Sequence, residues 1–174
     1  VCGSEGTLGL VTEATLTLHP RPRAKGLGVI GFTSLEAAIA AVEPCLGLEP
    51  SAVELLDDLV IGVARQNAEC RRYAELMPQP ERGELWAVLY VEFFLPEGEA
   101  RVRERLAELE RLVGRIDPDA GYAALTDAVE IEQALLLRKH GEPLLHALPG
   151  ARKPLGFVED NAVPVERLGE FVRE

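Results

Sequence analysis

An arginine on an apolar helical stretch is the first residue whose type and position could do chemistry. Arg138 shares a predicted helix face with Ile131 and Leu135, at spacings that bring i, i+4 and i+7 together. An arginine on such a stripe must meet an anion or extend to solvent. Its planar guanidinium matches a carboxylate with two parallel hydrogen bonds. The residues alone leave two interpretations open: a structural ion pair, with Glu159 or Asp160 as the partner, or a site for a substrate carboxylate.

The glycine-rich stretch at residues 3–9 is the second candidate. Its glycines would let backbone N–H groups approach a phosphate or a planar cofactor closely. No lysine follows them, as a Walker phosphate loop requires. A strand follows them where the dinucleotide fingerprint requires a helix. An ordinary tight loop therefore remains the alternative interpretation.

Other reactive side chains do not form a recognisable catalytic or metal-binding set. Ser4 lacks the flanking glycines of a nucleophile elbow, because Cys2 occupies the first of those positions. The adjacent carboxylates Glu159 and Asp160 would point to opposite faces of a strand. The three cysteines and three histidines are scattered, without a Cys-x-x-Cys pair. We expect no catalytic residue and no metal ligand in this chain, and a reducing cytoplasm as its compartment.

Composition narrows the class of protein. The 174 residues are 47% hydrophobic, which is typical of one globular domain with a sizeable core. The net charge of -11 disfavours a nucleic-acid binder and electrostatic docking on anionic lipid. A single arginine can still bind an anion locally. The longest apolar run, at 85–91, is too short to cross a membrane, which takes about 20 residues.

The order of predicted elements indicates the fold class. A strand at 10–18 ends at two prolines, Pro20 and Pro22, which predict a domain boundary at residue 23. The segment at 50–56 is ambiguous between strand and helix. The remaining pattern fits an α+β fold, a ferredoxin-like antiparallel sheet with helices packed on one face. Its predicted strands lie at 27–32, 85–94, 122–125 and 155–158, and its predicted helices at 35–46, 56–70, 98–113, 127–140 and from 164 onward.

Residues 3–16, with the sequence GSEGTLGLVTEATL, resemble the closing segment of the flavin-binding domain in the FAD-linked oxidases. This family includes D-lactate dehydrogenases, glycolate oxidase flavin subunits and D-2-hydroxyglutarate dehydrogenases. Two further stretches, 128–141 and 157–168, resemble the family's arginine-bearing helix and its acidic strand-to-helix signature. The sequence of these stretches is similar to that of long family members, in which the flavoprotein is fused to an iron–sulfur region. The resemblance covers essentially the whole chain.

The resemblance implies that the chain contains parts of two domains. Residues 1–23 would be the tail of an FAD-binding domain, and residues 24–174 the first part of the cap domain over the flavin. The parent protein would oxidise a D-2-hydroxy acid by hydride transfer to FAD, with any iron–sulfur cluster elsewhere in the parent. Arg138 would hold the substrate carboxylate. The positions that would line the FAD are Gly3, Ser4, Glu5, Gly6, Thr7, Gly9 and Val11.

The sequence also departs from the family pattern. Leu135 stands where the family usually has an aromatic residue, and Val158 where some relatives have a lysine. The family's catalytic base and metal-binding histidines are expected outside this chain, which begins at Val1 and reads as a piece of a longer protein. The isolated chain is therefore expected to be inactive and to bind FAD weakly at most.

Two alternatives to this reading stay open. One is a stand-alone ferredoxin-like binding or regulatory domain without redox chemistry. The other keeps the flavin and changes the substrate, as in the related ether-lipid synthases. The sequence does not determine the hydroxy acid, the electron acceptor or the oligomeric state. It also leaves open whether this cytoplasmic protein contacts the inner face of a membrane through its electron acceptor.

Overall fold

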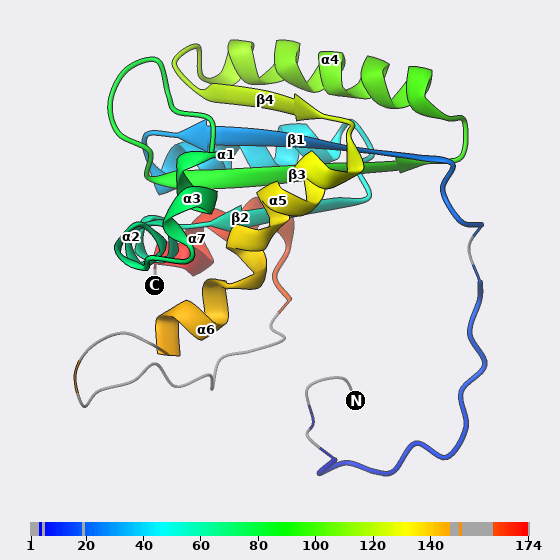
Figure 1. Ribbon diagram of the computed structural model, residues 1–174. Coiled ribbons are helices and arrows are strands. Elements are labelled where there is room, and N and C mark those ends of the chain that lie inside the picture. The colour runs from blue at the N-terminus through cyan, green and yellow to red at the C-terminus, as the bar shows by residue number, and fades with distance from the viewer. Residues whose placement is uncertain (1–3, 5, 19, 147–149, 151–161, 174) are drawn as a thin grey trace.

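A four-stranded antiparallel sheet organises the chain (Figure 1). The computed structural model describes residues 4, 6–18, 20–146, 150 and 162–173. The strand order is β2-β3-β1-β4, so the two long strands lie at the centre. The strands are β1 (Ala24–Phe32), β2 (Ala52–Leu56), β3 (Ala87–Leu95) and β4 (Gly121–Leu125).

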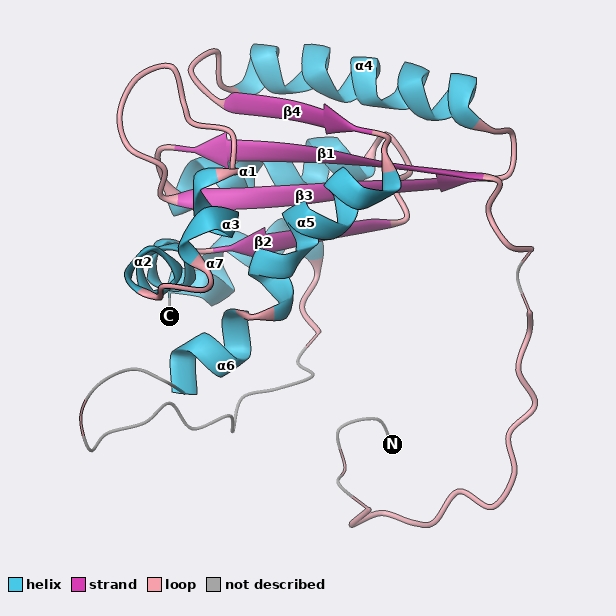
Figure 2. Cartoon of the chain, viewed as in Figure 1, coloured by secondary structure: helices cyan, strands magenta, loops and turns pink. Residues whose placement is uncertain are grey.

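Helices lie on both faces of this sheet (Figure 2). On one face are α1 (Leu35–Leu46) and α4 (Glu99–Ile116). On the other are α2 (Asp58–Gln66), α3 (Arg71–Glu75) and α5 (Ala128–Lys139). The helix α6 (Gly141–His146) follows α5 and contacts α2, and the C-terminal turn η1 (Val165–Arg167) with α7 (Leu168–Arg173) packs on α1.

Local capping residues set where the helices begin. The side chain of Ser34 accepts a hydrogen bond from the amide of Ala37 at the start of α1, at 3.1 Å. Asp57 does the same for Val60 at the start of α2. Asp127 accepts from the second and third amides of α5. Each cap satisfies backbone donors that have no partner within the helix.

The predicted α+β class with an antiparallel sheet is confirmed, but its helices are not restricted to one face. Alternate residues of β1 point to opposite sides, so Val29 and Ile30 lie in different cores. Strand β3 repeats the pattern with Tyr90 and Val91. Both central strands are thus apolar on both faces, and water must be excluded from each. The one-sided expectation is corrected for this reason.

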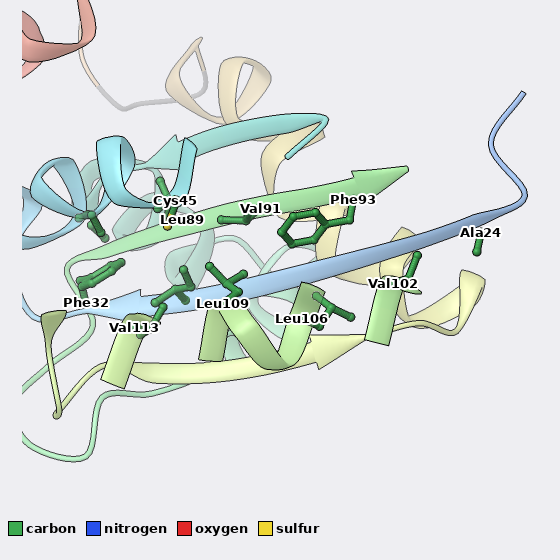
Figure 3. Packing of buried hydrophobic residues seen from close by; sticks show 14 residues of the cluster. Ala24, Phe32, Cys45, Leu89, Val91, Phe93, Val102, Leu106, Leu109 and Val113 are labelled. Carbon is green, nitrogen blue, oxygen red and sulfur yellow. The ribbon is translucent and has the colours of Figure 1, made fainter. Parts of the chain in front are cut away.

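The core on the α1 and α4 side depends on close approach of a helix to the sheet (Figure 3). Val102 and Leu109 of α4 lie directly above Gly26 and Gly28 of β1, in the space that a Cβ atom would take. Larger residues at these positions would force the helix away from the strand. The apolar stripe of α4 therefore fits β1 because β1 presents glycine there. The buried members of the stripe are Val102, Leu106, Leu109 and Val113.

The predicted strand at 10–18 does not join the sheet. The described residues of this segment form no ladder, and Leu10 and Leu18 are each 88% exposed. In Figure 1 the segment runs away from the sheet as an extended arm. A strand needs a partner for its backbone groups, and the described part of the chain supplies none. The ambiguous segment at 50–56 contains β2, and the predicted strand at 155–158 lies outside the described residues.

The packing of the loop after α3 against β1 can be tested by substitution. A Cβ at Gly31 would collide with the backbone carbonyl of Pro78, which side-chain rearrangement cannot relieve. We expect Gly31→Ala to lower the free energy of unfolding by about 1–3 kcal/mol. Gly62→Ala is the matched control, because no atom lies within 4 Å of its Cβ position in α2. This control should raise stability by up to about 1 kcal/mol through helix propensity. Urea denaturation of both variants measures the difference, and equal effects would contradict the packing.

Candidate functional site

Arg138 lies in the last turn of α5 and forms an ion pair with Glu54 of β2. The bond joins the guanidinium Nε to a carboxylate oxygen of Glu54. The two side chains are 44% and 31% exposed, so the pair is accessible to a small solute. The structure thus shows an ion pair at the predicted arginine. Glu159 and Asp160, the partners considered from the sequence, lie outside the described residues.

The alternation of β2 explains why Glu54 faces α5. In the register with β3, Glu54 is opposite Tyr90 and Leu55 is opposite Leu89. Leu55 packs in the core beneath α1 and α4, so its neighbour Glu54 must point to the other face. The apolar–polar–apolar alternation of Val53-Glu54-Leu55 is the sequence signal for this orientation. It could not be used, because the segment was ambiguous between strand and helix and the side of the sheet on which Glu54 lies was therefore undetermined.

Tyr90 of β3 holds α5 against the face of the sheet on which both lie. Its side chain is fully buried, and its hydroxyl donates to the carbonyl of Ala134 at 3.1 Å. The sulfur of Met77 lies at the same distance from that hydroxyl. Burial raises the pKa of the Tyr90 hydroxyl above its ordinary value, so the group stays protonated and remains a donor. Arg138 is one helical turn beyond Ala134, and this anchor sets where its side chain begins.

The geometry of the ion pair leaves part of the guanidinium available. Glu54 takes the Nε–H, and within the described residues no hydrogen bond engages either Nη group of Arg138. Those two nitrogens present parallel donors of the kind that bind a carboxylate with two hydrogen bonds. The arrangement can therefore orient the arginine through one edge and bind an anion through the other.

Further charged groups share this face of the sheet. Lys25 of β1 lies with its Nζ 4.6 Å from the centre of the Phe94 ring, directly across the strand pair. Glu92 is half-buried on the same side. Desolvation raises the pKa of the Glu92 carboxyl, and the nearby Lys25 partly opposes this effect. Charges of both signs thus lie at the end of the sheet where β1 begins.

The glycine-rich segment lies apart from Arg138. Gly3 and Glu5 are outside the described residues, and the others are exposed or half-buried. The amide and hydroxyl of Thr7 donate to the carbonyl of Ser4 at 2.8 and 2.6 Å, and Gly6 has a φ of 76°. The result is a tight turn that glycine favours. The structure does not bring the two predicted halves of the site together.

A flavin would need more protein around it than the described residues provide. No atom lies within 4 Å of the Cβ positions of Gly6 or Gly9. Open backbone of this kind allows a planar group to approach, but the described part of the segment encloses no cavity. These residues therefore fit one edge of a cofactor site and do not form a complete one.

The described residues contain neither a cluster of metal-ligating side chains nor a membrane-spanning helix. No group of three or more His, Cys, Asp or Glu side chains in that part of the chain could hold a metal ion. None of the helices described is long and apolar enough to span a bilayer.

The fold defines an α+β domain with an antiparallel sheet between two layers of helices. The model of the family "FAD linked oxidases, C-terminal domain" matches residues 21–174, and the chain belongs to this family. The proposed boundary at residue 23 stays a prediction.

Curated relatives agree with the family. The chain is 31% identical to a D-2-hydroxyglutarate dehydrogenase of Haemophilus influenzae over 99% of its own length and 17% of the relative's. It is 28% identical to the enzyme of that name from Pantoea ananatis, over 100% of the chain and 17% of the relative. It is 29% identical to the glycolate oxidase subunit GlcD of Bacillus subtilis, over 98% of the chain and 33% of the relative. The chain thus spans a sixth to a third of the length of these proteins.

The Tyr90 anchor is testable by removing one oxygen atom. Tyr90→Phe should cost about 0.5–1.5 kcal/mol of stability, because a buried hydrogen bond is lost. Amide hydrogen exchange should accelerate in α5 more than in α4. Tyr122→Phe is the matched control, since that hydroxyl donates to Leu106 of α4 at 2.7 Å. Faster exchange in α5 for both variants, or for neither, would count against Tyr90 as the anchor.

Proposed function

We propose that this chain is the substrate-side part of a longer FAD-dependent oxidoreductase that oxidises a D-2-hydroxy acid of the lactate, glycolate or 2-hydroxyglutarate type. The observation that carries the proposal is Arg138, held through Nε by Glu54 and with neither Nη group hydrogen-bonded to a described residue. The relatives named as D-2-hydroxyglutarate dehydrogenases and as a glycolate oxidase subunit support the substrate class.

Arg138 would bind the carboxylate that every 2-hydroxy acid carries. Two parallel hydrogen bonds fix the position and the plane of that carboxylate, and the adjacent C2 atom is then held in one place. Glu54 would keep the guanidinium oriented while the substrate enters and leaves. A bound FAD would supply the hydride acceptor. Orientation of this kind lowers the entropic part of the barrier.

The N-terminal arm would supply the flavin-side contacts. The proposed FAD-lining positions on it are Gly3, Ser4, Glu5, Gly6, Thr7, Gly9 and Val11. Its exposed apolar side chains, Leu8, Leu10, Leu16 and Leu18, would be buried against the rest of an FAD-binding domain. An iron–sulfur cluster elsewhere in the parent, a cytoplasmic location and peripheral contact with a membrane through the electron acceptor complete the proposal.

Substitution of Arg138 in the intact flavoprotein tests its role. Arg138→Gln should lower kcat/KM for the hydroxy acid roughly 10- to 100-fold, because hydrogen bonds from a charged donor are lost. Its stability should fall by less than about 1 kcal/mol, since the ion pair with Glu54 is exposed. Arg111→Gln removes the same charge from the exposed face of α4 and should change neither quantity. An unchanged kcat/KM for Arg138→Gln would refute the assignment.

The cofactor is tested separately by spectroscopy. The intact protein should show a flavin absorption band that bleaches anaerobically on addition of D-lactate or D-2-hydroxyglutarate. The isolated 174-residue chain should bind added FAD weakly, because its described residues form only one edge of a site. A band that persists with both acids would favour the transferase alternative. A colourless intact protein would favour the binding-domain alternative, and a tight one-to-one FAD complex of the isolated chain would contradict the proposed division.

A further inference from the structure

A hollow of about 460 Å³ lies beside the start of β1, and neither Arg138 nor Glu54 is among its lining residues. Its walls come from the segment before β1, the first residues of β1, the start of α4 and one side of α5. The volume falls in the range of small-molecule sites, roughly 300–1,000 Å³. Neither the fold nor the proposed hydride transfer requires an opening here.

Four cationic side chains line this hollow: Arg21, Arg23, Lys25 and Lys139. Two of the chain's three lysines are thus among its lining residues. The chain as a whole carries 29 acidic against 18 basic residues. A cluster of cations is therefore unexpected in such an acidic protein. The positive charges repel one another unless an anion lies between them.

Lys25 interacts electrostatically with Glu92 of β3, but no close ion pair with a described carboxylate engages these cations. None of the four forms an ion pair within 4.0 Å among the described residues, although arginines of α4 pair with glutamates of the same helix and Arg167 of η1 pairs with Glu170 of α7. Two glutamates, Glu99 and Glu132, also line the hollow. Glu99 is already paired with Arg103, at 3.2 Å. The hollow thus holds more positive than negative charge, and its own carboxylates do not neutralise the cations.

The cations belong to two walls of the hollow, formed by separate segments of the chain. The amide of Arg23 donates to Leu95 at 3.1 Å, which extends the pairing of β1 and β3 and fixes the first wall. Lys25 is held on the same wall by the Phe94 ring. Lys139 is the last residue of α5 and belongs to the second wall. On this second wall, Ile131 and Leu135 of α5 supply apolar lining.

We propose that this hollow binds a small dicarboxylate. Cations on two walls, with apolar side chains also lining the hollow, match a ligand with two anionic ends joined by a short methylene chain. Partial burial of the ligand would strengthen both charge interactions, while the apolar lining would cover the chain between them. The net charge of -11 would repel anions elsewhere on the surface, so the hollow is a local exception.

Isothermal titration of the 174-residue chain tests the proposal without any flavin. Glutarate is the probe, pentanoate has the same chain length with one carboxylate, and inorganic phosphate is a compact dianion. Glutarate should bind at least tenfold more tightly than either of the others. Lys25→Gln and Lys139→Gln should each weaken glutarate binding about tenfold or more, because a charge-assisted contact is lost.

Arg65→Gln is the matched control, because it removes one exposed positive charge from α2, at the far end of the sheet in Figure 1. It should change the glutarate affinity less than twofold. Both lysines are exposed, so their variants should keep the thermal melting curve of the parent chain. Absence of glutarate binding, equal binding of pentanoate or phosphate, or an equal loss with Arg65→Gln would overturn the proposal.

Kinetics of the intact flavoprotein then distinguish two sources of the ligand. Competitive inhibition by glutarate against D-2-hydroxyglutarate, relieved by Lys139→Gln, assigns the hollow to the second carboxylate of the substrate. Non-competitive inhibition relieved by the same variant assigns it to a separate dicarboxylate. Each pattern supports the hollow, whereas inhibition that Lys139→Gln leaves unchanged counts against it. Failure of the flavin to bleach would contradict the proposed function and leave the titration result standing.

Discussion

The central strands β1 and β3 are apolar on both faces, and the positions of the surrounding helices depend on this constraint. A two-sided strand pair cannot face water on either side. The α1 and α4 layer closes one side, where the glycines of β1 let α4 approach. The second layer, which contains α5, must close the other. The helix that carries Arg138 is therefore present over the sheet for reasons of burial before any function is considered.

The same helix links burial to chemistry. Its middle is fixed by the hydroxyl of Tyr90, a group that stays protonated because it is buried. Its last turn carries two neighbouring cations with different surroundings. Arg138 turns to Glu54 of β2, whereas Lys139 lines the hollow near the start of β1. One element thus carries a guanidinium paired with β2 and an ammonium that lines the hollow.

Electrostatics in this protein is local. An overall charge of -11 would lead to the expectation that every cation is neutralised by a nearby carboxylate. In the first half of α4 this holds, since Arg101, Arg103 and Arg105 pair with glutamates three or four residues away. At the start of β1 the cations come from separate segments, and four of them line the hollow with only two glutamates. Sequence-local pairing is satisfied by helix geometry, while pairing between segments depends on the fold.

From the sequence alone, the family, the α+β class, the long strands and helices, and the position of Arg138 on a helix could be predicted. Periodicity and capping residues such as Asp127 carry that information locally. The second helical layer could not be foreseen, because an apolar strand does not show what covers it. The partner of Arg138 was also hidden: Glu54 is 84 residues away along the chain, and only the register of β2 with β3 turns it toward α5. The cations of the hollow likewise meet only in three dimensions, because β1 and α5 are brought together by the burial of the sheet face between them.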